Sequence, residues 1–178
     1  DFITAGFSSA VEIPAALDTT GLSPRANQWR FVDFDGDGAM DLVIGLGVWS
    51  DYGWDNAFNS WGKWTRGPLH GYVYVARNLA DNEKPEYDTP EMLFAGQGPV
   101  DVFGAPSPCF ADFDGDGDLD LISGSFLDKF TYYQNVGKRD RPEYLPGVEL
   151  QHEGRPLLMD LQMLQVVALD WDGDGDVD

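Results

Sequence analysis

Three short runs of the sequence concentrate aspartates between glycines. The run DFDGDG occupies residues 33–38 and returns at 112–117, and DWDGDG stands at 170–175. Two like charges about 4 Å apart repel by roughly 4 kcal/mol at an effective dielectric of about 20. The glycines favour a tight turn that keeps the carboxylates close together, and a divalent cation among them would turn the repulsion into attraction. The runs therefore predict metal-binding loops rather than solvated acidic turns.

The spacing of the aspartates indicates which metal. A calcium loop takes side-chain ligands at positions 1, 3 and 5 and a backbone carbonyl at position 7, with a glycine at position 6 for the turn. An aspartate also stands at position 9 of each run. All-oxygen ligand sets suit Ca²⁺, because Mg²⁺ loses its water reluctantly and Zn²⁺ prefers nitrogen and sulfur. The sequence thus predicts about three structural Ca²⁺ ions, held by Asp33, Asp35, Asp37, the Ala39 carbonyl and Asp41; by Asp112, Asp114, Asp116, the Asp118 carbonyl and Asp120; and by Asp170, Asp172, Asp174, the Asp176 carbonyl and Asp178.

The residues after each loop separate these runs from EF-hands. An EF-hand needs a bidentate Glu at position 12, where this sequence has Ile44 and Ser123. Position 9 instead begins DLVIG (41–45) and DLISG (120–124). Short apolar runs that end in glycine are typical of buried strands.

Composition and charge limit the function classes. The chain has 178 residues, 43% of them apolar, and a net charge of −20. This composition predicts a folded domain with a core, and the negative charge argues against nucleic acids and anionic membrane surfaces as partners. No apolar stretch approaches the roughly 18 residues that membrane insertion needs. Calcium loops of modest affinity, about 10⁻⁴–10⁻³ M, fill only outside the cytosol, so the metal predicts a secreted, extracellular or cell-surface location.

Strand-like runs repeat around the loops. One run precedes each loop, the D-L-x-x-G run follows it, and an alternating run ends at Asn78 or Asn135. With Gly, Pro and Asp turns between them, four short strands per unit predict an all-β fold of propeller blades, each a four-stranded antiparallel sheet. The predicted units are residues 1–80, 81–137 and 138–178, and the third stops before its D-L-x-x-G run. The run 157–167 has some helical spacing, but its place in the repeat favours a strand.

One segment lies outside the repeat. Asp41 and Asn78 are 37 residues apart, whereas Asp120 and Asn135 are 15 apart, so the first unit carries an insertion of about 22 residues within 46–71. Aromatic side chains crowd it, and flat aromatic faces stack on sugar rings. We therefore expect a carbohydrate ligand at Tyr52, Trp54, Trp61 and Trp64. The alternative is that these aromatics pack the long loop onto the propeller or a neighbouring domain.

The insertion also contains residues that could perform catalysis. Elimination beside a uronate needs a cation to neutralise the carboxylate and a base to take the proton. Lys63 or Arg66 could be the cation, and His70 or Tyr52 the base. A polysaccharide lyase acting on acidic glycans is therefore an alternative function, although no sequence rule fixes the geometry of these residues.

The pattern D-x-D-G-D-G-x-x-D-L, followed by an apolar strand and Gly, resembles the FG-GAP/VCBS repeat family of calcium-loop propellers, which includes the head of integrin alpha subunits. The resemblance covers nearly all of the chain except the insertion. It implies calcium loops that join adjacent strands of a blade. It also implies an extracellular binding, adhesion or assembly module, whose ligand is carbohydrate or another extracellular protein; related propellers occur in bacterial polysaccharide lyases.

The number of predicted units is smaller than the number of blades in a closed propeller. A closed propeller has about four to eight blades, and this sequence holds two units and the front half of a third. We therefore expect additional blades from a longer polypeptide. The alternative is completion by other chains through strand addition, as in a calcium-dependent surface filament, because an unfinished blade presents an unpaired edge.

Overall fold

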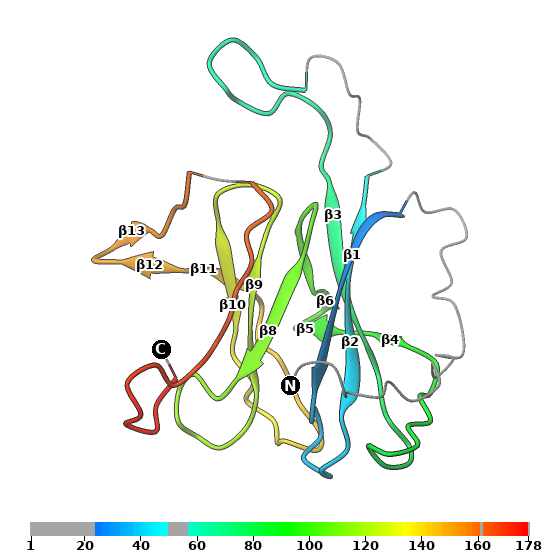
Figure 1. Cartoon of the computed structure of the whole chain (residues 1–178). Helices are drawn as coiled ribbons and strands as arrows, with labels where there is room; N and C mark the ends of the chain where they lie inside the picture. Colours follow the sequence, from blue (N-terminus) through cyan, green and yellow to red (C-terminus); the bar gives the residue numbers. More distant parts are fainter. Residues whose placement is uncertain (1–23, 50–56, 161, 178) are drawn as a thin grey trace, which may run out of the picture.

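The computed structural model describes residues 24–49, 57–160 and 162–177, and within them the chain forms strands and no helix. The described part accordingly contains no helix that could cross a membrane. A five-stranded antiparallel sheet comes first (Figure 1). Its strands are β1 (Pro24–Val32), β2 (Asp41–Val48), β3 (His70–Ala76), β4 (Glu91–Met92) and β7 (Asp101–Phe103), with β4 and β7 both paired to β3.

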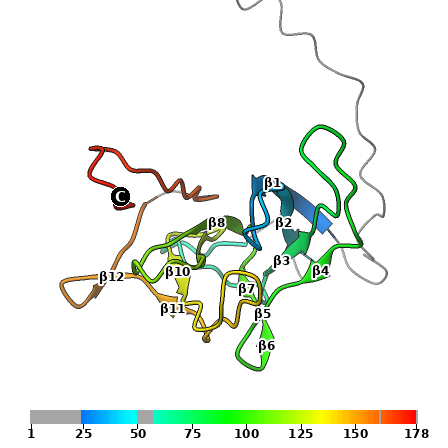
Figure 2. The ribbon, with the colours of Figure 1, turned by 90° about the horizontal axis from the view of Figure 1, so that it is seen from below.

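A four-stranded antiparallel sheet follows, in the order β11-β10-β9-β8. Its strands are β8 (Ser107–Ala111), β9 (Asp120–Gly124), β10 (Phe130–Tyr133) and β11 (Val148–Glu149). Two small hairpins, β5 (Phe94–Ala95) with β6 (Gly98–Pro99) and β12 (Gln151–His152) with β13 (Arg155–Pro156), complete the described strands. The two main sheets stand next to each other, with β1 and β8 in contact (Figure 2). The all-β prediction is confirmed, and the arrangement is that of two adjacent blades of a partial propeller.

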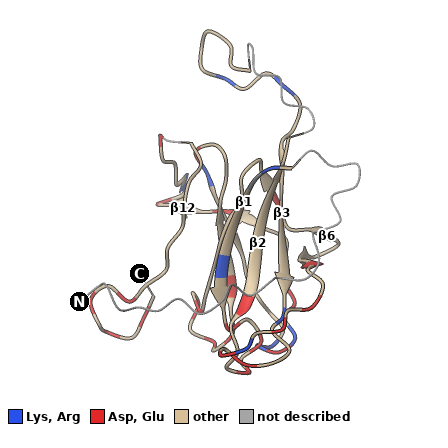
Figure 3. Cartoon of the chain, turned by 45° about the vertical axis from the view of Figure 1, so that its right-hand side comes forward, with Lys and Arg blue, Asp and Glu red and all other residues tan. Residues whose placement is uncertain are grey.

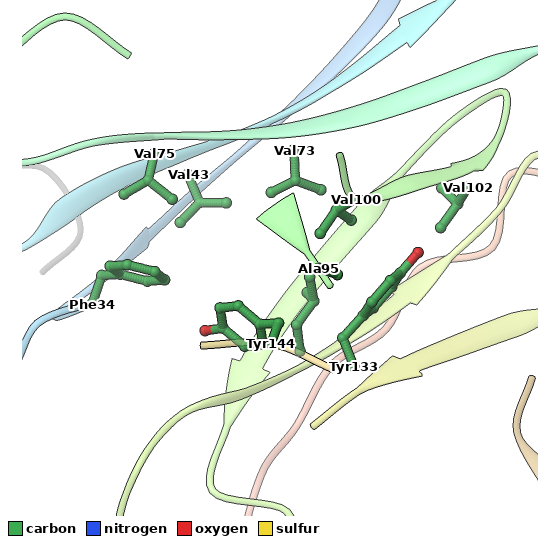
Figure 4. Close-up of a cluster of buried hydrophobic side chains, with 10 residues drawn as sticks. Phe34, Val43, Val73, Val75, Ala95, Val100, Val102, Tyr133 and Tyr144 are labelled. Carbon is green, nitrogen blue, oxygen red and sulfur yellow. The ribbon is translucent and has the colours of Figure 1, made fainter. Parts of the chain in front are cut away.

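The core lies between the two blades. Side chains from β2, β3 and the loop before β2 face residues of the second sheet and its connections (Figure 4). This cluster consists of Phe34, Val43, Val73, Val75, Ala95, Val100, Val102, Leu121, Tyr133 and Tyr144. A second cluster, which includes Leu42, Ile44 and Leu46, covers the opposite face of β2. Every residue of β2 is therefore buried, as the apolar run after the first loop predicts.

The glycine that closes each D-L-x-x-G run lies where the next unit crosses the sheet. A Cβ atom at Gly45 would lie 2.6 Å from the Pro106 carbonyl oxygen, and one at Gly124 would meet the Leu164 carbonyl oxygen at still closer range. Pro106 and Leu164 each lie six residues before a loop begins. The third unit therefore contacts the second blade at the position where the second blade contacts the first.

The strand expected over residues 157–167 does not form in the described part of this segment. Leu158 makes only an isolated bridge to Lys129. The backbone N–H groups of Met163 and Leu164 donate to the carbonyls of Phe126 and Ser125, in the turn after β9. The strand prediction is wrong here because a ladder needs a parallel or antiparallel neighbour, and the described residues place a turn beside this segment instead.

Candidate functional site

The three aspartate runs form loops of one shape. In each, three carboxylates offer ligand atoms within 4.8 Å of one another: Asp33, Asp35 and Asp37; Asp112, Asp114 and Asp116; Asp170, Asp172 and Asp174. The two glycines of the first loop have φ angles of 81° and 91°, and those of the other loops also lie in the left-handed region. Since this region strains residues with a Cβ atom, the glycines are what lets the chain curl around the carboxylates.

Hydrogen bonds inside the loops repeat as well. In the first loop the Gly36 N–H donates to Asp33 Oδ1 at 2.8 Å, and the Ala39 N–H donates to Asp37 Oδ1 at 2.7 Å. The same two bonds recur in the second and third loops. The first two loops connect β1 to β2 and β8 to β9. The third, all of whose described aspartates are exposed, lies beyond the second blade.

The aspartate at position 9 has a second role that the sequence did not reveal. Asp41 is 1% exposed, and its Oδ1 accepts the N–H of Asn78 at 2.7 Å while its Oδ2 accepts the N–H of Phe34 at 2.8 Å. Asp120, also 1% exposed, accepts the N–H of Asn135 at 2.7 Å. Burial raises the pKa of both carboxyls, against the lowering effect of these bonds. Asp178, the corresponding residue of the third loop, lies outside the described residues.

An asparagine and a tyrosine extend each of these contacts into a brace. Asn78 Oδ1 accepts the N–H of Glu86 at 3.0 Å, and the Tyr87 hydroxyl donates to the Met40 carbonyl at 3.3 Å. In the second blade Asn135 and Tyr144 make the matching bonds, to the Glu143 N–H and the Leu119 carbonyl. The tripeptide P-E-Y begins seven residues after each asparagine, at 85–87 and 142–144, and this repeat is the sequence signal that could have indicated the brace.

Asp118 distinguishes the second loop from the first, which has Ala39 at the same position. Asp118 is 8% exposed, and its buried Oδ1 has no hydrogen-bond partner. Burial raises the pKa of this carboxyl, and the four other aspartates of the loop raise it further. A buried carboxylate oxygen without a partner is costly. The fit to a cation rests on the other carboxylates of the loop: Asp112, Asp114 and Asp116 offer oxygen ligand atoms within 4.8 Å of one another, and such an all-oxygen set suits Ca²⁺.

Two arginines and a glutamine contact the acidic loops at one end of the blades, where acidic and basic segments lie together (Figure 3). Arg77 Nη1 lies 2.6 Å from Asp35 Oδ2, and Gln134 Nε2 donates to Asp114 Oδ2 at 2.7 Å. Arg139 Nη2 donates to the Asp33 carbonyl at 2.6 Å from the second blade. The sequence alone drew attention to none of these three residues.

The described part of the insertion is a hairpin at the other end of the first sheet (Figure 1). Phe58 bridges to Trp64, and Trp64 meets Phe58, Phe103 and Phe126 edge-to-face at centroid distances of 5.3, 5.6 and 6.2 Å. Trp64 therefore packs the insertion onto the blades, whereas Trp61 is 87% exposed. Tyr52 and Trp54 lie outside the described residues.

A cavity of about 380 Å³ opens beside this hairpin. Its lining combines apolar and acidic groups: Phe58, Gly62, Leu127, Asp128, Asp160 and Gln162. Small-molecule sites usually combine apolar or aromatic side chains with a few polar groups.

His70 has a partner that the sequence did not indicate. Its Nδ1 lies 2.6 Å from Asp101 Oδ2, and its ring stacks on Tyr72 at 5.7 Å with an interplanar angle of 4°. A carboxylate on one ring nitrogen orients an imidazole and leaves the other nitrogen to act as a base. Lys63 and Arg66 lie in the hairpin and are exposed.

Comparisons with known proteins identify no relative: no family model, no curated protein and no solved structure matches the chain.

Proposed function

We propose that this chain is a calcium-stabilised propeller segment of the FG-GAP/VCBS type that acts outside the cell as a binding module for carbohydrate. One observation carries the calcium proposal: the same loop, with three aspartate ligand atoms within 4.8 Å, recurs between the first two strands of successive sheets. The aspartates would hold the ion, which supplies positive charge and no chemistry of its own.

The position of the loops supports a structural role for the ion. Each of the first two loops joins two strands, and its position-9 aspartate bonds to the asparagine that follows the third strand of its sheet. A cation in the loop would offset the repulsion among the aspartates at the point where three strands meet. The ion would thereby stabilise the end of each blade.

The cavity beside the hairpin supports a neutral carbohydrate as the ligand. Sugar hydroxyls donate hydrogen bonds, and Asp128, Asp160 and Gln162 offer acceptor oxygens. Phe58 in the lining and the exposed Trp61 offer flat apolar faces. Two carboxylates in the lining disfavour an acidic sugar, so this cavity fits a neutral glycan better than a uronate.

Thermal unfolding with and without calcium tests the metal. Each site filled at a free calcium concentration about 100 times its Kd adds about 2.7 kcal/mol. In a domain of this size that raises Tm by roughly 5–11 °C per site. Magnesium at the same concentration is the control and should raise Tm far less. An unchanged Tm in millimolar calcium would refute the calcium proposal.

A glycan array probed in calcium-containing buffer tests the ligand. We expect binding of neutral glycans, weakened at least tenfold by Trp61→Ala and by Asp128→Asn. Trp29→Ala is the matched control, because Trp29 is a half-exposed tryptophan on β1, away from the hairpin. Wild-type binding by Trp61→Ala and Asp128→Asn would exclude this cavity as the sugar site.

Catalysis is the second candidate function, and the pairing of His70 with Asp101 favours it. The carboxylate would stabilise the imidazolium that forms when His70 takes a proton. A lyase would release unsaturated products that absorb ultraviolet light from an acidic polysaccharide. His70→Gln should abolish them, and the absence of such products with the wild-type chain would eliminate this candidate.

Assembly is the third candidate, and exposed apolar side chains on β1 and the third unit favour it. Trp29 and Phe31 are 49% and 59% exposed, and Val167 and Leu169 are 66% and 42% exposed. A further blade or a second copy of the chain would bury them. Sedimentation across a concentration series should show calcium-dependent self-association if copies of this chain are the partner; a monomer at every concentration would rule this out.

A further inference from the structure

The two loops that belong to the described blades differ in their charged surroundings. Loop one (33–41) contains four aspartates and contacts Arg77 and Arg139. Loop two (112–120) contains five aspartates, because Asp118 stands where loop one has Ala39. Among the described residues, no aspartate of loop two forms an ion pair with Lys or Arg. The formal charge is therefore −2 at loop one, from four carboxylates and two guanidinium groups, and −5 at loop two.

Arg77 and Gln134 occupy equivalent places. Each directly precedes the asparagine whose N–H bonds to the position-9 aspartate. Each also donates to the aspartate at position 3, Arg77 at 2.6 Å and Gln134 at 2.7 Å. The same hydrogen bond is thus made by a cation in one blade and by a neutral amide in the other.

Arg139 reaches loop one from the other blade. Its Nη2 donates to the Asp33 carbonyl, and its Cγ lies over Gly36, where an added Cβ would be 2.9 Å away. Its Nε is buried without a hydrogen-bond partner. The guanidinium is therefore held against loop one by the contact between the blades.

The surroundings of Asp118 in loop two differ from those of the equivalent residue in loop one. Loop two holds a buried carboxylate oxygen with no partner, 8% exposed as a residue and among four other carboxylates. Loop one holds a buried methyl group at that position, since Ala39 is 5% exposed. In the ranges that the structure describes, the loop-two aspartates therefore lack the guanidinium contacts that loop one has.

We propose that loop two is the high-affinity calcium site of the described blades and that loop one is a weaker site, in which Arg77 and Arg139 supply part of the positive charge and hold the loop without metal. This inference rests on the proposed calcium function. A positive charge within a few ångströms of a divalent cation weakens binding by about tenfold even at the dielectric of water. Calcium therefore fills loop two first, and the contact between the blades persists without metal at loop one.

Calcium titration followed by ¹H–¹⁵N NMR of the full chain tests the order of filling. Gly38 and Gly117 occupy position 6 of the two loops, so their amide signals report each loop separately. We expect Gly117 to reach half its shift at a calcium concentration about tenfold or more below that for Gly38. Arg77→Gln and Arg139→Gln should each move the Gly38 midpoint down by about tenfold and leave Gly117 unchanged.

The reciprocal variant Gln134→Arg is the matched control, and it keeps the test valid if the arginine variants fail to fold. It should raise the Gly117 midpoint by about tenfold while the Gly38 midpoint stays in place. Equal midpoints in the wild-type chain, or a Gly117 midpoint that ignores Gln134→Arg, would overturn the inference and leave the calcium proposal intact. If no glycine signal moves in millimolar calcium, the calcium proposal itself fails.

Discussion

The carboxylate of Asp41 should stabilise the first blade even when no metal is bound. It is 1% exposed and accepts one backbone N–H from the loop, at Phe34, and one from the residue two places after β3, at Asn78. The perturbation is a pair of substitutions, Asp41→Asn and Asp41→Ala, compared in calcium-free buffer. Without calcium, any loss of stability reports these hydrogen bonds and not metal ligation.

The structure sets the size of the effect. A buried donor left without a partner costs about 1–3 kcal/mol. Asp41→Asn keeps one acceptor and turns an amide NH₂ toward the other N–H, whereas Asp41→Ala leaves both N–H groups unpaired, at about 2–6 kcal/mol. Burial raises the pKa of the Asp41 carboxyl, so removing the charge recovers part of this loss, and we expect about 2–3 kcal/mol for Asp41→Ala. In a chain of 178 residues that lowers Tm by roughly 4–12 °C.

Circular dichroism melts in excess chelator measure this difference. Asp37→Ala is the matched control, because Asp37 is exposed and accepts one N–H, that of Ala39. Its loss leaves that N–H unpaired but relieves repulsion in the loop, so Tm should fall clearly less than in Asp41→Ala. If Asp41→Ala melts with the wild-type chain in chelator, the carboxylate is only a metal ligand. If Asp37→Ala loses as much as Asp41→Ala, the loss is not specific to the brace.

Three further predictions follow from burial and packing. Burial raises the pKa of Asp41, Asp118 and Asp120, so these carboxyls bind protons more tightly in the folded chain than in the unfolded one. Melts across a pH series in calcium-free buffer should therefore show stability rising as pH falls from neutral toward about 4. A fall in stability over that range would contradict the raised pKa values. Trp64→Ala should lower the free energy of unfolding in urea by about 3–5 kcal/mol, because Trp64 packs on three aromatic rings. Trp61→Ala should change it by no more than about 0.5 kcal/mol. Equal losses would mean that Trp64 does not anchor the insertion. Gly45→Ala should destabilise the chain by about 1–3 kcal/mol, since the new Cβ would lie 2.6 Å from the Pro106 carbonyl oxygen. Gly38→Ala is the control, because Gly38 has open space around it and the substitution strains only the backbone. A Gly45→Ala chain as stable as the wild type would show that the blades are not in close contact there.

Features set by neighbouring residues were predictable from the sequence. The D-x-D-G-D-G pattern determines the left-handed glycines and the clustering of carboxylates within six residues. The apolar run after it predicts β2 and β9, because a strand buried on both faces needs no alternation. The repeat of these local patterns was enough to predict successive antiparallel sheets.

Features set by contacts between distant residues were not predictable. Asp41 meets Asn78 across 37 residues, and Arg139 meets Asp33 across 106. Position 9 was therefore interpreted only as a ligand, and Arg139 was not singled out. The same limit explains the insertion: Trp61 and Trp64 are three residues apart in one aromatic-rich run, and only the fold shows that one is exposed and the other packed.

The brace and the aspartate loops contribute separately to the stability of each blade. The buried oxygens of Asp41 accept backbone N–H groups, and those of Asp120 accept the Asn135 N–H and the Tyr132 hydroxyl. The point where three strands meet is therefore hydrogen-bonded within the protein. The aspartates at positions 1, 3 and 5 lie farther out, where repulsion among them opposes the turn. A cation bound there, as we propose, would act on the outer half of each loop and would add to a contact that the protein already makes. On this basis removal of calcium should loosen the loops and lower Tm while the blades remain paired. The larger change should occur at loop two, whose aspartates contact no guanidinium within the described part of the chain.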